Sequence, residues 1–152
     1  MVVRIGSLLS VGSLSLCVVA AAAAPALAVT PTIVTVQSAR WQPGTGAFKG
    51  LQVATIVGDP KASGEYYSYL IKMPDGVRVP PHFHAQTENV NVISGTLLVG
   101  VGDTVNAANM MPLGAGAIVS IPAGLHHYAM SKGPTIVEVS GVGPDVLTPV
   151  RQ

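Results

Sequence analysis

The sequence is poor in cysteine and in charge. Its 152 residues include a single cysteine, Cys17, and charged residues make up 10% of the chain. Cys17 lies in an apolar N-terminal run, so the chain after that run contains no thiol and can form no disulfide bond. Eight basic and seven acidic residues are spread along the chain without a basic cluster. This composition lacks the positive surface that nucleic acids require, and we expect no nucleic-acid partner.

The N-terminal run has the order of features found in secretory signal peptides. Arg4 precedes an apolar and small-residue stretch over residues 5–24, and Ala26-Leu27-Ala28 then provides an A-x-A cleavage site. We therefore predict a signal peptide at residues 1–28 and a mature chain beginning at Val29. A retained membrane anchor is the alternative, since the stretch is long enough to span a bilayer. Cleavage predicts export to the periplasm or the extracellular space, without stable membrane insertion.

Long amphipathic periodicity is also missing after Val29. Short runs rich in Val, Ile, Tyr and Thr alternate instead with turns rich in glycine and proline. We predict strands at 51–57, 66–73, 90–93, 96–101, 117–121, 127–130 and 135–139. Many short strands separated by turns predict an all-β fold, an antiparallel sandwich or barrel, and the length suits a single domain.

The alternation within these runs predicts which faces are buried. Tyr67, Tyr69, Ile71 and Met73 share one face, which should point two tyrosine hydroxyls toward the interior. The run 97–101 is apolar on both faces, as expected of a strand covered on one side by a second sheet and on the other by a partner subunit. Together with the low charge, this predicts a homodimer.

The four histidines fall in two short segments bracketed by glycine and proline. His82 and His84 are two residues apart, so their rings project from one face of an extended strand, and Glu88 reaches that face if residues 85–87 form a turn. Such a set suits Mn²⁺, Fe²⁺, Zn²⁺, Ni²⁺ or Cu²⁺. An isolated pair of this kind is more often two ordinary histidines, but the second pair, His126 and His127, favours a metal site.

The spacing of these residues resembles the two sequence motifs of the cupin family. The first motif matches at Gly76, His82, His84, Glu88 and Gly95, and the second at Gly116, Pro122, Gly124 and His127, with Ser131 where an asparagine is usual. The resemblance covers about Gln37–Gly143. It implies a small, single-domain, exported bacterial cupin with an antiparallel β-barrel or jelly roll. It also implies a divalent metal ion held by His82, His84, Glu88 and His127.

Only one of the adjacent histidines can enter the barrel, because neighbours on a strand point to opposite faces. The spacing from Pro122 and Gly124 selects His127, and the small Ala129 leaves room inside. We expect His126 to face solvent or the rim of the pocket.

An open metal position in an apolar barrel suits a small organic molecule. We expect Tyr67, Tyr69, Met73 and Met110 or Met111 to line its pocket, although inward Tyr and Met are often only core packing. Two function classes remain open. One is a metalloenzyme of oxygenase, isomerase or lyase type, and the other is a non-catalytic protein that binds metal or a small ligand for storage or sensing. No separate general acid or base stands out, so no catalytic residue is assigned.

Overall fold

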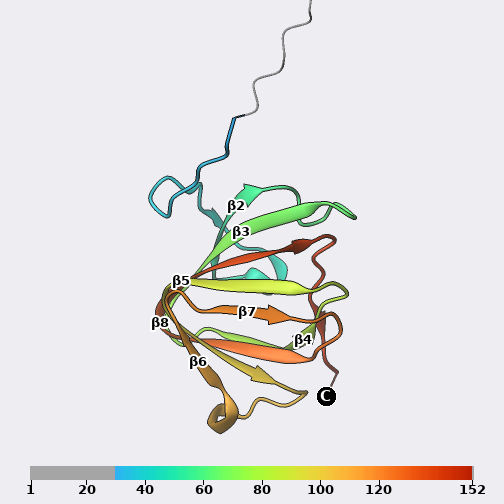
Figure 1. Ribbon diagram of the computed structural model, residues 1–152. Coiled ribbons are helices and arrows are strands. Elements are labelled where there is room, and N and C mark those ends of the chain that lie inside the picture. The colour runs from blue at the N-terminus through green and yellow to red at the C-terminus, as the bar shows by residue number, and fades with distance from the viewer. Residues whose placement is uncertain (1–29, 152) are drawn as a thin grey trace, which may run out of the picture. The chain divides into compact units, whose positions relative to one another are not determined.

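The computed structural model describes residues 30–151, so the predicted signal peptide and its cleavage site lie outside the described residues. Within this range the chain forms nine strands and two short 3-10 helices (Figure 1). The elements are β1 (Gln42–Pro43), η1 (Gly46–Phe48), β2 (Gln52–Val57), β3 (Tyr66–Met73), β4 (Arg78–Phe83), β5 (Glu88–Val101), η2 (Ala107–Asn109), β6 (Met111–Gly114), β7 (Ile118–Ile121), β8 (His127–Val142) and β9 (Thr148–Pro149). None of the described helices is long and apolar enough to cross a membrane.

The strands form two antiparallel layers that share the long strands β5 and β8. The C-terminal half of β8 pairs with β3 and with the first half of β5, which in turn pairs with β7. The N-terminal half of β8 pairs with β4 and with the second half of β5, which pairs with β6. β1 and β2 extend the first layer beside β3, and β9 extends the second beside β4. The fold is therefore all-β and antiparallel, as predicted.

The β5–β8 ribbon changes layer near its middle, where the pairing register shifts between Val92 and Thr96. Gly95 lies in this region with a φ of 81°, a left-handed conformation that L residues with a side chain rarely adopt. A Cβ atom added at Gly95 would lie 2.4 Å from the carbonyl oxygen of Pro134. The close approach of the two backbones at this bend depends on the absence of a side chain.

The structure contains a strand at every predicted run, but the prediction split two continuous strands into two runs each. The runs 90–93 and 96–101 are parts of β5, and the runs 127–130 and 135–139 are parts of β8. The glycines between them mark bends within continuous strands, not ends. Strands β1, β4, β6 and β9 were not predicted. At β4 the reason is that Pro80 and Pro81 have no N–H to donate, which argues against a strand. β4 tolerates them because its ladder with β8 is interrupted between Val79 and His82, where the prolines lie.

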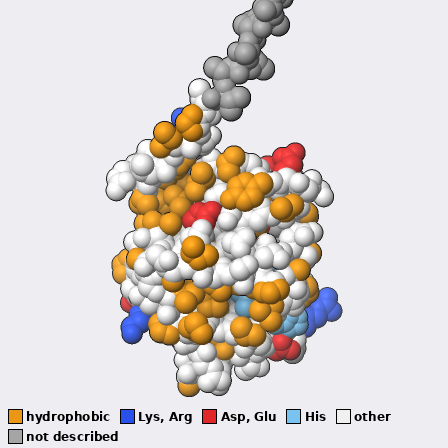
Figure 2. Space-filling model, viewed as in Figure 1, with side chains coloured by type: hydrophobic (Ala, Val, Ile, Leu, Met, Phe, Trp, Pro, Cys, Tyr) orange, Lys and Arg blue, Asp and Glu red, His pale blue; other side chains and the backbone are white. Residues whose placement is uncertain are grey.

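The core lies between the two layers and contains the predicted face of β3. Tyr67, Tyr69, Ile71 and Met73 are all buried in one apolar cluster, with Val90, Val92, Leu97, Val137 and Val139 from β5 and β8. The opposite face of β3 is also covered in part, since Ser68 is buried and donates a hydrogen bond to Glu138. Charged side chains are sparse on the face shown in Figure 2, where hydrophobic side chains gather over the strands.

Ser131 occupies the position where the second motif usually ends in asparagine, and it has a structural role of its own. Its buried hydroxyl donates to the carbonyl of Pro74 (2.5 Å) and accepts from the amide of Val77 (3.0 Å). These two bonds fasten the β3–β4 turn to β8. The serine therefore ties down the local structure that leads into the first histidine strand.

We expect Gly95→Ala to lower the free energy of unfolding by at least about 2 kcal/mol, because the new methyl group meets the Pro134 backbone in a left-handed conformation. Gly116→Ala is the matched control, since Gly116 has a similar left-handed φ of 85° but nothing lies within 4 Å of the Cβ position there. Urea unfolding of both variants measures the difference. Equal stabilities would show that the bend does not depend on Gly95.

Candidate metal centre

Four predicted side chains meet at one end of the space between the layers. His82 lies near the end of β4, His84 follows that strand, Glu88 begins β5 and His127 begins β8. His82 and His127 are direct partners across the β4–β8 ladder, so their rings face the same interior space. Residues 85–87 lie between β4 and β5 and return Glu88 to the same side, as the sequence analysis expected. All four residues are buried.

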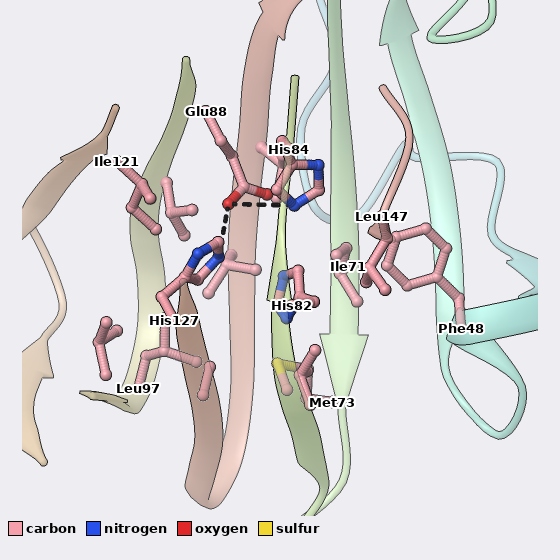
Figure 3. Close-up of a pocket in the computed structure, with 16 residues that line it drawn as sticks. Phe48, Ile71, Met73, His82, His84, Glu88, Leu97, Ile121, His127 and Leu147 are labelled. Atoms are coloured by element: carbon pink, nitrogen blue, oxygen red, sulfur yellow. Dashed lines mark ion pairs between the residues drawn. The ribbon is translucent and has the colours of Figure 1, made fainter. Parts of the chain in front are cut away.

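One donor atom from each of the four residues lies within 4.8 Å of the others. Oε2 of Glu88 is central, at 3.4 Å from Nε2 of His127 and 3.8 Å from Nε2 of His84 (Figure 3). The ring of His82 lies against that of His127, with centroids 4.2 Å apart. The structure thus brings together every residue that the sequence analysis assigned to the site.

Two of the imidazoles are oriented by backbone carbonyl groups. Nδ1 of His82 donates to the carbonyl of Pro80 at 2.8 Å, and Nδ1 of His127 donates to the carbonyl of Leu125 at 2.9 Å. Because Nδ1 carries the proton in these bonds, Nε2 of each neutral ring keeps its lone pair free. That is the tautomer in which a histidine binds a metal ion through Nε2.

The third imidazole, His84, is held by a carboxylate that the sequence analysis did not assign to the site. Nδ1 of His84 lies 2.9 Å from Oδ1 of Asp145, although the two are not aligned as a hydrogen bond, so we treat the contact as mainly electrostatic. The hydroxyl of Tyr69 donates to the other oxygen of Asp145 at 2.6 Å. Asp145 follows the last long strand in a loop, and no spacing in the sequence points to it. The sequence offered one indirect indication of a polar partner here, because Tyr69 shares the buried face of its strand and its hydroxyl needs a hydrogen-bond acceptor.

These contacts shift the pKa values of the site residues in opposite directions. Burial lowers the pKa of His82 to about 4, so its ring is neutral at physiological pH. Burial alone would also lower the pKa of His84, but Asp145 and Glu88 outweigh it and raise that pKa above its ordinary value. Burial opposes ionisation of Asp145 as well, yet the contacts with His84 and Tyr69 hold its pKa below the ordinary value. Burial, reinforced by Asp145, raises the pKa of Tyr69, so its hydroxyl stays protonated.

The four donors open onto a small, mainly apolar cavity. The volume available to the centre of a water molecule is about 60 Å³, which is room for a few water molecules beside the donor atoms. Met73 and Ala129 line this cavity, as expected, together with apolar side chains of both layers. Tyr67 and Tyr69 are buried but do not line it, and neither do Met110 and Met111. Met111 is 65% exposed, because β6 lies at the edge of its layer with that side chain outward.

His126 points away from the four donors. Its side chain is 37% exposed, its Nδ1 lies 2.6 Å from a carboxylate oxygen of Asp103, and its ring stacks on Phe83. His127 is 3% exposed and lies inside. The structure therefore places the two neighbours on opposite faces, in the arrangement expected from the strand geometry.

The donor set fits a divalent transition metal ion. Nε2 of His84 is buried without any hydrogen-bond partner, which is costly for a polar atom unless something occupies the space it faces. Ligands of one ion, each ~2.1 Å from it, lie at most ~4.2 Å apart, so small side-chain rotations would bring the four atoms into one coordination sphere. Three imidazoles and one carboxylate suit a first-row divalent metal and leave positions open for other ligands.

Comparison with known proteins agrees with this geometry. The family described as "Cupin domain" matches residues 69–142, a segment that contains all four donors. This chain belongs to the cupin superfamily. Two rice proteins (Oryza sativa subsp. japonica), germin-like protein 9-3 and putative germin-like protein 9-2, are each 33% identical to this cupin over 82 residues, 53% of its chain. The matched segment spans only 38% of the length of either relative.

Solved structures share the fold at low sequence identity. The polyketide cyclase RemF from Streptomyces resistomycificus superposes with a TM-score of 0.63 at 16% identity, covering 81% of this chain and 87% of RemF. An RmlC-like cupin from Shewanella frigidimarina gives a TM-score of 0.56 at 19% identity, covering 81% of this chain and 95% of that protein. KdgF from Halomonas sp. gives 0.54 at 17% identity, covering 72% and 93%. Such identities establish the jelly-roll fold and nothing about the reaction.

We expect Asp145→Asn to weaken metal binding about 10- to 100-fold at pH 8, because the amide keeps the shape of the side chain but removes the charge that orients and polarises His84. Tyr69→Phe should have a smaller effect in the same direction, since it removes only the hydroxyl that holds Asp145. Competition titration with a chromogenic chelator measures both affinities. Unchanged affinity in Asp145→Asn would show that this carboxylate does not contribute to metal binding.

Metal affinity should fall as the pH is lowered, because a proton on an imidazole competes with the ion. The raised pKa of His84 means that this competition begins above the ordinary value of 6.5, with about a tenfold loss of affinity per pH unit for each proton displaced. A further loss is expected near pH 4, where His82 takes up a proton. In Asp145→Asn the first decline should start at a lower pH, because His84 loses the charge that raises its pKa. An affinity that does not change between pH 8 and pH 5 would contradict this assignment.

Proposed function

We propose that this cupin binds one divalent transition metal ion through His82, His84, Glu88 and His127, and that it acts there on a small organic molecule. The observation that carries the proposal is the convergence of four buried donors in an apolar cavity, with Nε2 of His84 lacking any other partner. The tautomers set at His82 and His127 support it, because both rings keep Nε2 free for an ion. Mn, Fe, Zn, Ni and Cu are all compatible with these ligands.

The reaction we favour is of oxygenase, isomerase or lyase type. A bound ion would supply a Lewis acid that polarises an oxygen of the substrate and, for iron or manganese, a redox centre. The chain's own contribution is to keep His82 neutral, to direct Nε2 of His82 and His127 inward, to exclude bulk water with apolar walls, and to keep Asp145 ionised behind His84. Among the described residues that line the cavity, Glu88 is the only carboxylate. We therefore assign no separate general base.

A second function is supported by the size of the inner cavity. A volume of about 60 Å³ accommodates an ion and a few water molecules but not an organic substrate of ordinary size. A protein that stores or senses metal, or that holds a ligand without transforming it, would need no more space. Turnover is what distinguishes the two functions.

The neighbouring histidines offer a matched pair of variants. His127→Ala should lower metal affinity by at least about tenfold, or ~1.4 kcal/mol, because it removes a buried donor. His126→Ala should retain near-normal occupancy, because that ring contacts Asp103 and Phe83 on the outer side. Elemental analysis of both purified variants gives the result. Full metal content in His127→Ala, or an empty site in His126→Ala, would overturn the assignment.

Oxygen uptake by the metal-loaded protein tests the reaction class. We expect uptake that depends on Fe or Mn with at least one member of a panel of phenols, diketones and sugars. His127→Ala should abolish that uptake and His126→Ala should not. Tight binding of a panel member without turnover would select the storage or sensing function instead.

Export and homodimerisation stay predictions. Export is supported by the sequence of residues 1–28 alone. Homodimerisation is supported by apolar side chains that the described part of the chain leaves exposed, including Tyr66, Ile118 and Val142 on the outer faces of the strands.

A further inference from the structure

A second hollow lies directly beside the metal-site cavity and is much larger. By the same measure its volume is about 530 Å³, against about 60 Å³ for the inner cavity. It is lined by residues 43–45, 47–48, 60–61 and 145–147, together with Val53, Thr55 and Tyr69. Small-molecule sites usually fall between about 300 and 1,000 Å³, so the outer hollow has the capacity that the inner cavity lacks.

The two spaces share a wall. Phe48 and Leu147 line both of them, and Figure 3 shows these two side chains together at one side of the site. Phe48 is only half-buried and packs edge-on against Tyr69, with ring centroids 6.0 Å apart. Phe48 and Leu147 therefore lie between a molecule in the outer hollow and the inner cavity.

Asp145 connects the outer hollow to the metal site. Asp145 lines the hollow, and its side chain, only 6% exposed, touches Nδ1 of His84 and accepts a hydrogen bond from Tyr69. Because its charge is already engaged by those two groups, Asp145 is a poor partner for a cation in the hollow. A ligand lying there would sit next to the group that orients His84.

Lys61 supplies the positive charge of the hollow. It is the basic residue of the lining, it is exposed, and no acidic side chain in the described range 30–151 forms an ion pair with it. The remaining lining is mostly apolar, with the hydroxyls of Thr45 and Thr55. One lysine among apolar walls suits a single negative charge on an apolar body and disfavours a multiply charged phosphate ester.

We propose that the outer hollow binds a small organic carboxylate, with its apolar or aromatic body against Phe48 and Leu147 and its carboxylate at Lys61. The hollow is then the ligand compartment of the protein, and the barrel interior holds the ion. The statement that the ligand is the substrate rests on the proposed function. Binding to the hollow does not, because no metal donor lines it.

Benzoate and its neutral isostere benzamide test the binding step on the metal-free protein. Protein-observed NMR titration should show that benzoate binds with a Kd in the millimolar range or tighter. Benzamide should bind about tenfold more weakly. The shifted resonances should include those of Leu147, Val53 and Tyr69. Equal binding of the two compounds, or no binding of benzoate below about 10 mM, would overturn the proposal.

Lys61→Met and Lys49→Met form a matched pair of variants. Both lysines are exposed, and Lys49 follows Phe48 but does not line the hollow. Lys61→Met should remove the preference for benzoate over benzamide, while Lys49→Met should keep it. If Lys61→Met instead changes the mass measured by light scattering and leaves benzoate binding intact, the hollow is a contact between copies and the proposal is wrong.

Loading with Mn²⁺ distinguishes failure of this proposal from failure of the metal site. If the ion binds next to the hollow, it should broaden the ring-proton signals of bound benzoate, and Lys61→Met should abolish the broadening. Benzoate binding without any uptake of Mn²⁺ would refute the proposed function and leave the carboxylate site standing. Mn²⁺ uptake with unbroadened benzoate signals would refute the placement of the ligand beside the ion.

Discussion

Glu88 and His127 stand at opposite ends of a long two-stranded ribbon, and their contact inside the barrel is the feature on which the rest of the site depends. Along the β5–β8 ladder, Glu88 is opposite Gly141 and His127 is opposite Val101. The two side chains nevertheless lie 3.4 Å apart, because the ribbon folds over between the two layers. β4 completes the site, since it adds His82 directly across from His127. A straight ribbon would separate the same residues by its whole length.

The arrangement concentrates polar atoms in an apolar space, which is unfavourable unless each atom finds a partner. Backbone carbonyls orient two of the imidazoles, and the Tyr69–Asp145 pair orients the third. These partners all contact Nδ1, through a hydrogen bond at His82 and His127 and through charge at His84, so they leave Nε2 of each ring free for an ion. Each ring thus has its partner on the Nδ1 side, and Nε2 of His84 has no hydrogen-bond partner. An ion that binds there would complete the pairing without any rearrangement of strands.

In the two proposals, different parts of the chain hold the ion and the ligand. Most residues that line the inner cavity belong to strands, whereas the outer hollow is lined mainly by residues 43–45, 47–48, 60–61 and 145–147. Loops tolerate sequence change better than paired strands do. Asp145 belongs to both parts, because it lies in one of these loops and also contacts the donor His84.

The sequence by itself determined the fold class, the positions of the predicted strands β2, β3, β5, β7 and β8, and the four side chains that meet in the cavity. Alternation of apolar residues reports burial directly, and the histidines could be recognised by their fixed spacing. It could not show that β5 and β8 are continuous, because glycines that permit a bend resemble glycines that end a strand. It missed β4, because its prolines are tolerated only where the ladder with β8 is broken. Only the tertiary structure indicated roles for Asp145 and Lys61. Both lie in loops, where no periodicity links a residue to its neighbours in space, so only the folded chain places one behind His84 and the other beside the hollow.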